Sequence, residues 1–289
     1  MNVLAEKWNA RRFAWKLLWK LIRRCLADSY GKFKYQPVFE EMYRYSLGGM
    51  NVGGGELVDQ SGETAVIMYA TQRFSSTTSA PVIFDVGANQ GQYAEQVLKV
   101  VGDKCWLYCF EPSETTFAQL QQRIGARPNV SLYNIGLGET EGICTLYTGA
   151  ADSGLASLYR RRLDHFGISL DAEEQVFLKT LDGFCEENAI KTIHLLKLDV
   201  EGHELGVLRG AQKLIKAGAI KIIQFEFGGC NIDSHTFFQD FFYLLNPHYT
   251  LHRVVQDGWV VLPTYQEHYE LFFTTNFLAV SRSVTAKEV

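Results

Sequence analysis

The stretch that decides the fold is Val82-Ile83-Phe84-Asp85-Val86-Gly87-Ala88-Asn89-Gln90-Gly91. Its apolar first half predicts a buried strand, and the pattern that follows predicts a helix over 91–100. Glycines between them let the backbone adopt conformations closed to other residues and approach a ligand closely. The start of the helix offers free N–H groups to that ligand. Because open α/β sheets bind ligands at the carboxyl ends of their strands, we expect this loop to contact a nucleotide-like cofactor.

From Pro81 onward the sequence alternates between strand and helix patterns. The predicted strands cover 82–86, 105–110, 130–135, 193–199 and 220–227, and the predicted helices cover 91–100, 114–124, 201–217 and 234–245. This alternation predicts an α/β fold with a doubly wound, mostly parallel sheet. Three more strands at 249–255, 259–262 and 276–281 have no helix between them, so we expect the tail to close the sheet in the antiparallel direction. The insert over 140–180 is predicted as hairpins and irregular chain.

The spacing of the glycines distinguishes between two classes of cofactor. Dinucleotide-binding loops carry G-x-G-x-x-G, whereas three residues separate Gly87 from Gly91. Asp85 places a carboxylate two residues before Gly87, where it would favour a cationic ligand and disfavour a pyrophosphate. S-adenosylmethionine carries an ammonium and a sulfonium group. We therefore expect this cofactor in contact with Asp85, Gly87, Ala88, Asn89 and Gly91. A purely structural glycine turn is the alternative.

A second acid follows the next predicted strand. Glu111 lies in Phe110-Glu111-Pro112, where the proline ends the strand and fixes the turn. In dinucleotide-binding folds a carboxylate at this place accepts hydrogen bonds from the ribose hydroxyls. We therefore expect Glu111 to bind the ribose of the cofactor.

Candidates for catalysis follow the fourth predicted strand, in His194-Leu195-Leu196-Lys197-Leu198-Asp199-Val200-Glu201-Gly202-His203-Glu204. Strand side chains alternate, so Lys197 and Asp199 share a face, and Glu201 joins them if the strand continues. We predict Asp199, Glu201 and His203 as the catalytic residues, with Asp199 or His203 as general base. Lys197 could equally form an internal ion pair, and His203 could be an exposed residue at a helix start. A divalent cation on the acids is a further alternative, but no metal is assigned.

These segments together resemble the FkbM family of methyltransferases. The resemblance runs from about Val82 to Val280 and rests on five pieces in order: Phe84-Asp85-Val86-Gly87-Ala88-Asn89-Gln90-Gly91, Phe110-Glu111-Pro112, Asn134-Ile135-Gly136-Leu137-Gly138, Thr180-Leu181-Asp182, and Lys197–Glu204 followed by Val207-Leu208-Arg209-Gly210-Ala211. It implies a class I methyltransferase (Rossmann-like) fold and S-adenosylmethionine as methyl donor. It also implies O-methylation of a hydroxyl on a sugar, glycolipid or polyketide-type product. Its third piece adds Asn134 and Gly136 to the expected cofactor site.

Two functions of other kinds stay open. A non-catalytic binding or scaffold protein could keep the cofactor fold, although the intact set of Asp85, Gly87, Gly91 and Glu111 argues against this interpretation. An NAD-dependent oxidoreductase is disfavoured by the glycine spacing. The acceptor itself is not identified by the sequence. The three arginines at 160–162 either meet an acidic acceptor near the pocket or form a solvated face.

The chain before residue 81 lies outside the resemblance. We predict an N-terminal helical extension over 1–80 and a cofactor-binding domain over 81–289, with a basic amphipathic helix at about 5–27. Residues 1–34 hold nine Lys/Arg and two acids, a net charge of +7, so the other 255 residues sum to −11. The acidic body argues against nucleic acid as a partner. The helix either packs on the main domain or a partner subunit, or lies on an anionic membrane surface.

The cysteine pattern bears on where the protein works. Six cysteines are scattered with no C-x-x-C pair, which is typical of reduced thiols. Neither a secretory signal nor a run of 18 apolar residues is evident. We therefore expect a cytoplasmic protein, with peripheral contact at the inner membrane surface as an option for the 5–27 helix.

Overall fold

The computed structural model describes residues 16–54, 61–74, 80–149 and 154–285. The contacts divide the chain into two compact units, Met1–Gly49 and Met50–Val289. In the first unit, residues 16–26 are helical. Short 3-10 turns η1 (Ala27–Ser29) and η2 (Phe33–Tyr35) and helix α2 (Gln36–Gly49) follow. The part of the predicted 5–27 helix before residue 16 lies outside the described residues. None of the helices described is long and apolar enough to cross a membrane.

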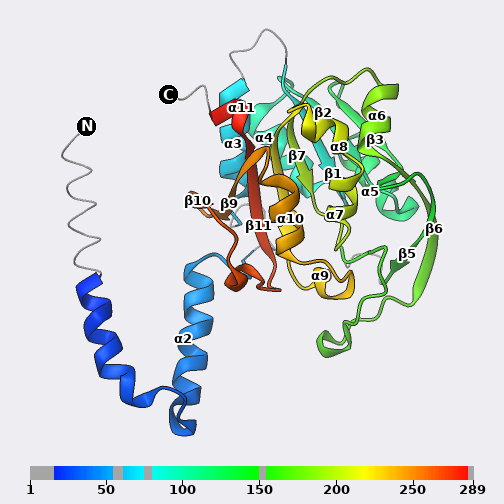
Figure 1. Ribbon diagram of the computed structural model, residues 1–289. Coiled ribbons are helices and arrows are strands. Elements are labelled where there is room, and N and C mark those ends of the chain that lie inside the picture. Colours follow the sequence, from blue (N-terminus) through cyan, green and yellow to red (C-terminus); the bar gives the residue numbers. More distant parts are fainter. Residues whose placement is uncertain (1–15, 55–60, 75–79, 150–153, 286–289) are drawn as a thin grey trace. The chain divides into compact units, whose positions relative to one another are not determined.

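An eight-stranded sheet forms the centre of the second unit (Figure 1), in the order β10-β9-β11-β8-β7-β1-β2-β3. Strands β3, β2, β1, β7 and β8 run parallel, whereas β11 is antiparallel to β8 and β9, and β10 is antiparallel to β9. The bounds are β1 Val82–Val86, β2 Trp106–Phe110, β3 Val130–Tyr133, β7 Ile193–Leu198, β8 Ile220–Phe227, β9 Tyr249–Val255, β10 Gly258–Leu262 and β11 Thr275–Ser281. The predicted doubly wound sheet with an antiparallel C-terminal closure is confirmed.

Helices cover both faces of this sheet. One face buries apolar residues of α3 (Glu63–Phe74), α4 (Gln92–Val101) and α5 (Glu114–Ile124). The other face buries those of α6 (Leu181–Glu187), α7 (Glu204–Arg209), α8 (Gln212–Lys216) and α10 (Phe238–Leu245). After β1 the chain moves outward to β2 and β3, then returns to β7 on the other side of β1. The sheet therefore has its switch point between β1 and β7, where ligands of such folds bind.

The unit boundary falls earlier than the predicted domain boundary at residue 81. Val66, Ile67 and Ala70 of α3 are buried in the same core cluster as β1 and α4. The apolar face of α3 therefore belongs with the sheet.

A helix predicted over 201–217 begins late. Glu201 and Gly202 both adopt left-handed backbone conformations, with φ of 51° and 104°. Such residues cannot continue a right-handed helix, so α7 begins only at Glu204.

The same predicted helix is also interrupted. At Gly210 the backbone passes so close to a neighbouring loop that an added Cβ would lie 2.0 Å from the carbonyl oxygen of Gly138. The chain turns there, and the Asp182 carboxylate accepts hydrogen bonds from the backbone N–H groups of Lys213 and Leu214 at the start of α8. A tertiary contact, which periodicity cannot show, therefore divides the helix into α7 and α8.

The insert folds as a small second sheet. Strands β4 (Gly136–Leu137), β5 (Gly142–Thr148) and β6 (Ala172–Lys179) form it in the order β4-β6-β5, and β5 pairs with β6 in the antiparallel direction. The chain between β5 and β6 contains the 3-10 turn η3 (Asp164–Phe166). The remaining short helices are α9 (Cys230–Asp233), η4 (Glu267–Tyr269) and α11 (Arg282–Thr285).

Candidate active site

The loop after β1 meets the loop after β7 at the switch point. Gly87 has a φ of 79°, and a Cβ there would lie 1.8 Å from the carbonyl oxygen of Asp199. The backbone N–H groups of Gly87 and Ala88 both donate to the carbonyl oxygen of Phe110, at 3.0 and 2.9 Å. A glycine is therefore required where three strand ends converge, because no side chain fits between them.

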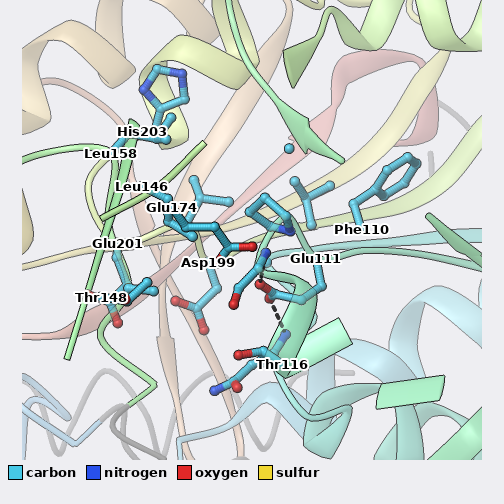
Figure 2. A pocket seen from close by; sticks show the side chains of 18 of the residues that line it. Phe110, Glu111, Thr116, Leu146, Thr148, Leu158, Glu174, Asp199, Glu201 and His203 are labelled. Atoms are coloured by element: carbon cyan, nitrogen blue, oxygen red, sulfur yellow. Dashed lines mark hydrogen bonds between the residues drawn. The ribbon is translucent and has the colours of Figure 1, made fainter. Parts of the chain in front are cut away.

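A pocket opens at these strand ends (Figure 2), with an empty volume of about 1110 Å³ that is partly open to solvent. Seven of the predicted site residues line it: Gly87, Asn89, Glu111, Gly136, Asp199, Glu201 and His203. The small sheet supplies another wall through Leu146, Thr148 and Glu174. The pocket thus brings together four of the predicted cofactor residues, from three segments, and all three predicted catalytic residues.

Glu111 is held rigidly at the wall of this pocket. Its side chain accepts one backbone hydrogen bond per oxygen, from Asn89 N to Oε2 and from Ser113 N to Oε1, both at 3.0 Å (Figure 2). Burial raises the pKa of Glu111 to about 7, although these two N–H groups act in the opposite direction. Each carboxylate oxygen has a second lone pair, so a carboxylate fixed in this way can still accept a pair of hydroxyl groups.

Four predicted cofactor residues do not line the pocket: Asp85, Ala88, Gly91 and Asn134. Asn134 acts on the backbone instead, because its side-chain N–H₂ group donates to the carbonyl oxygens of Glu111 and Pro112, at 2.9 Å each. Gly91 has a φ of 94° and directly precedes α4. These two residues fix the loops that present Asn89 and Glu111.

Asp85 lies beneath the pocket, on the face of the sheet that α3 and α4 cover. It is fully buried, and neither carboxylate oxygen has a hydrogen-bond partner within the described chain. The register places Asp85 beside Lys197 on the neighbouring strand β7. Burial raises the pKa of Asp85 to about 7; Lys197 opposes this rise, and the acids Asp199 and Glu63 add to it.

Lys197 forms an internal ion pair, the structural alternative for this residue, and its partner is Asp199. Its Nζ lies 2.9 Å from Asp199 Oδ2 and 3.7 Å from Glu63 Oε1, and it also sits 5.0 Å from the centre of the Tyr93 ring. Burial alone would lower the pKa of Lys197, but Asp199, Glu63 and Asp85 outweigh it and raise that pKa well above its ordinary value. Lys197 is therefore a permanent cation that holds the Asp199 carboxylate.

Glu201 is held by a different cation, Arg161. Its carboxylate forms an ion pair with the guanidinium of Arg161, whose side chain is only 8% exposed. Ser157 Oγ donates to the Glu201 carbonyl oxygen at 2.7 Å, which ties the insert to the loop after β7. Burial and then the nearby Asp199 raise the pKa of Glu201, and Arg161 acts against them. Of the three consecutive arginines, Arg161 is buried in this ion pair, whereas Arg160 is exposed and lies 3.8 Å from the carboxylate of Glu173.

His203 is packed between backbone segments. A Cβ at Gly138 would lie 2.9 Å from its Nε2, and one at Gly206 would lie 2.6 Å from the same atom. The hydroxyl of Tyr159 hydrogen-bonds Nδ1 at 3.0 Å. Burial lowers the pKa of His203 to about 4, so the ring is neutral at physiological pH. In Figure 2 the ring lies away from the carboxylates of Asp199 and Glu111.

Several site residues escape prediction from the sequence. Glu174 reaches the pocket from β6 and accepts a hydrogen bond from the backbone N–H of Glu114 at 2.7 Å, yet an acid on a short strand has no distinguishing pattern. Glu63 comes from α3, far from the motifs in sequence. Within the described ranges, no group of three or more His, Cys, Asp or Glu side chains is arranged to hold a metal ion.

The sequence also matches proteins of known type. The profile of the Methyltransferase FkbM domain matches residues 85–248. The 2-O-methyltransferase NoeI of Sinorhizobium fredii is 26% identical over 144 residues, which are 47% of this chain and 59% of that protein. The hexuronic acid methyltransferase AglP of Haloferax volcanii is 25% identical over 150 residues, which are 51% of this chain and 56% of that protein. The chain thus spans less than two thirds of the length of either relative.

A solved structure is also similar to this chain. The crystal structure of methyltransferase FkbM from Methylobacillus flagellatus has a TM-score of 0.41 and 15% sequence identity to this chain. The matched part covers 73% of this chain and 47% of that one.

Proposed function

The chain belongs to the FkbM methyltransferase family, and from this premise we propose that it is an S-adenosylmethionine-dependent O-methyltransferase. The proposal rests on one pocket that Glu111 and Asp199 both line, on either side of the Gly87 loop. Each carboxylate oxygen of Glu111 accepts one hydrogen bond from a backbone N–H group, which fixes the side chain. This pairs a site for a ribose diol with a carboxylate that can act on an acceptor.

The charges around the pocket suit this cofactor. Glu111 supplies hydrogen-bond acceptors for two ribose hydroxyls, and Asn89 and Gly136 line the same cavity. Beneath it, Lys197 faces three acids, Asp199, Glu63 and Asp85. Such an excess of acid favours a ligand with a sulfonium and an ammonium group over a pyrophosphate. Asp85 contributes through this charge rather than by contact.

Methyl transfer requires little covalent chemistry from the protein itself. When bound, the cofactor supplies an activated methyl group and leaves as a neutral thioether. The pocket walls would orient the acceptor hydroxyl, and orientation can contribute several kcal/mol to the rate. We assign proton removal from that hydroxyl to Asp199, because its carboxylate is 36% exposed and lines the pocket. Glu201 is bound to Arg161, and the packed, neutral His203 lies away from the acids.

The acceptor class is the second part of the proposal. The two relatives are named for methylation at a 2-O position and on a hexuronic acid. We therefore place a hydroxyl of a sugar or glycolipid first and a polyketide-type hydroxyl second. Glu174 and Thr148 on the small sheet line the pocket and could receive hydroxyl hydrogen bonds from a sugar.

Calorimetry with S-adenosylmethionine tests the donor. We expect wild-type protein to bind it and Glu111→Ala to lose binding, whereas Glu186→Ala, at an exposed ion pair with Lys213, should bind normally. A wild-type protein that does not bind would favour a cofactor-fold scaffold. Methyl transfer would then be screened by mass spectrometry against neutral sugars, uronic acids, glycolipids and polyketide alcohols. Transfer only to polyketide alcohols would contradict the proposed acceptor order.

For the first unit we propose peripheral contact with an anionic membrane or a partner subunit through the helix over 16–26. Leu17, Leu18, Trp19 and Leu21 are all exposed on it. The helix also carries Lys16, Lys20, Arg23 and Arg24, and such a combination suits a lipid surface with negative headgroups. A cytoplasmic location, proposed from the scattered cysteines, would place the helix at the inner surface of the membrane.

A further inference from the structure

Glu63 is a buried acid that precedes the matched family domain. It lies in the first turn of α3 and is 3% exposed. Its carboxylate accepts from Gln224 Nε2 at 2.7 Å and from Ser61 Oγ at 3.0 Å, and Oε1 lies 3.7 Å from Lys197 Nζ. The family profile begins at residue 85, so it does not include this acid.

Lys197 connects Glu63 to the pocket. The same ammonium donates to Asp199 Oδ2 at 2.9 Å, and Asp199 lines the pocket. Glu63 and Asp199 therefore hold one cation between them, with Tyr93 against its other side. Gln224 fixes Glu63 in turn, since its side-chain amide also donates to Asn276 Oδ1 at 3.1 Å. The line from Glu63 through Lys197 to the partly exposed Asp199 therefore consists of groups with defined partners.

The energetics suggest that this acid serves more than stability. Burying a carboxylate costs free energy unless partners compensate, and buried ion pairs often contribute little net stability. Here a single Lys197 is shared among Asp199, Glu63 and Asp85, so the cluster has more acid than base. Well-packed apolar side chains often hold elements together as firmly as a buried ion pair or more firmly, so holding α3 to the sheet does not by itself require this acid.

We propose that Glu63 is a positioning residue of the methyl-transfer site. Through Lys197 it holds the Asp199 carboxylate toward the pocket, where that carboxylate favours a cationic cofactor. The segment before the family domain thus completes the site. This inference rests on the proposed function, because it presumes that S-adenosylmethionine binds in the pocket.

A double-mutant cycle on the full chain tests the connection. S-adenosylmethionine and S-adenosylhomocysteine, in which a neutral thioether replaces the sulfonium, are titrated by calorimetry into wild type, Glu63→Gln, Asp199→Asn and the double variant. We expect each single variant to weaken S-adenosylmethionine binding about tenfold and S-adenosylhomocysteine binding less. The double variant should bind like Asp199→Asn alone, because Glu63 acts through that carboxylate.

The outcomes separate the inference from the proposed function. Wild-type protein that fails to bind S-adenosylmethionine would overturn the function. The role of Glu63 would be overturned if wild type and Glu63→Gln bind S-adenosylmethionine with the same affinity. It would also be overturned if the losses of affinity in Glu63→Gln and Asp199→Asn multiply in the double variant. Glu270→Gln is the matched control, since Glu270 is a structural acid that accepts from the backbone N–H groups of Phe238 and Gln239. It should leave binding unchanged.

Folding of the variants is checked by thermal unfolding. If Glu63→Gln does not fold, Glu63→Asp replaces it in the cycle. That variant keeps the charge but withdraws the carboxylate from Lys197 by one methylene. We expect Glu63→Asp to lower the affinity by a smaller factor and to have no further effect once Asp199 is replaced by asparagine. An effect of Glu63→Asp that persists in the Asp199→Asn background would contradict the inference.

Discussion

At the scale of single residues, Asp199 and His203 line one pocket but have different freedom to act. Asp199 is partly exposed and held by a buried lysine, whereas His203 is wedged between Gly138 and Gly206 and hydrogen-bonds Tyr159. A group that takes a proton must reach the acceptor. Of these two residues, Asp199 lies among the other acids of the pocket in Figure 2, whereas the His203 ring lies away from them. The geometry therefore favours Asp199 as the base.

We expect Asp199→Asn to lower kcat by ~10²–10⁴-fold with an acceptor found in the screen, because the amide cannot take a proton. His203→Gln should lower kcat by less than about tenfold, since it removes only a packing and hydrogen-bonding group. Steady-state rates at saturating S-adenosylmethionine measure both. Near-normal turnover by Asp199→Asn would remove Asp199 from the role, and a larger loss at His203 would return the role to the imidazole.

The unpartnered Asp85 makes stability depend on pH. Burial raises the pKa of Asp85 from 3.8 to about 7. The folded state therefore binds a proton that the unfolded state has already released, so the contribution to stability is complete below about pH 4 and lost as the pH rises to about 7. The shift corresponds to at most about 4 kcal/mol. We expect Asp85→Asn to flatten the fall in unfolding free energy over this window.

Urea unfolding of wild type and Asp85→Asn at several pH values between 4 and 8 measures that difference. Asp257→Asn is the control, since Asp257 is exposed in the turn between β9 and β10 and should leave the pH dependence as in wild type. Parallel curves for wild type and Asp85→Asn would show that Asp85 keeps an ordinary acidity in the folded protein.

At the scale of elements, the sequence predicts the parallel strands and the loops at their carboxyl ends. Apolar runs of strand length alternate with helical patterns, and the acids Glu111 and Asp199 directly follow such runs. These two acids lie near each other because the carboxyl ends of parallel strands meet at the same edge of the sheet. The late start of α7 and the break at Gly210 could not be predicted, because both depend on contacts with residues distant in sequence.

The alternation of side chains along β1 explains why Asp85 does not line the pocket as predicted. Side chains of a strand alternate, so Asp85 points away from the face on which Phe84 and Val86 pack. The loop pattern indicates an acid near the cofactor but not the side of the sheet on which it lies. The role of Glu63 is harder still to predict from the sequence. Gln224, which donates a hydrogen bond to its carboxylate at 2.7 Å, is 161 positions away along the chain.

The break between α7 and α8 gives an element-scale prediction. Gly210→Ala would place a methyl group 2.0 Å from the Gly138 carbonyl oxygen, so the backbone of one loop must shift. Overpacking of this kind costs about 1–3 kcal/mol. Chemical denaturation should show that loss, whereas Gly258→Ala, with open space around its Cβ, should change stability far less. Equal stabilities would mean that the loop after β4 yields freely.

At the scale of the whole molecule, the chain separates its charge. Its first 34 residues have a net charge of +7, and the other 255 have −11. The acidic part contains the pocket, with its preference for a cationic cofactor. The basic part contains the helix over 16–26, on which Lys16, Lys20 and Arg23 recur at helical spacing. Under the functions proposed above, the two parts favour partners of opposite kinds: a cationic cofactor for the acidic part and an anionic lipid surface for the basic part.

We therefore expect the full chain to sediment with vesicles containing phosphatidylglycerol and not with pure phosphatidylcholine vesicles, and to be released at about 1 M salt, where screening is strong. Replacing Lys16, Lys20, Arg23 and Arg24 by glutamine should abolish the binding without altering S-adenosylmethionine affinity. Trp19→Ala should weaken it through loss of apolar contact. Concentration-dependent dimers by analytical ultracentrifugation, without vesicle binding, would instead assign the exposed apolar residues to a subunit contact.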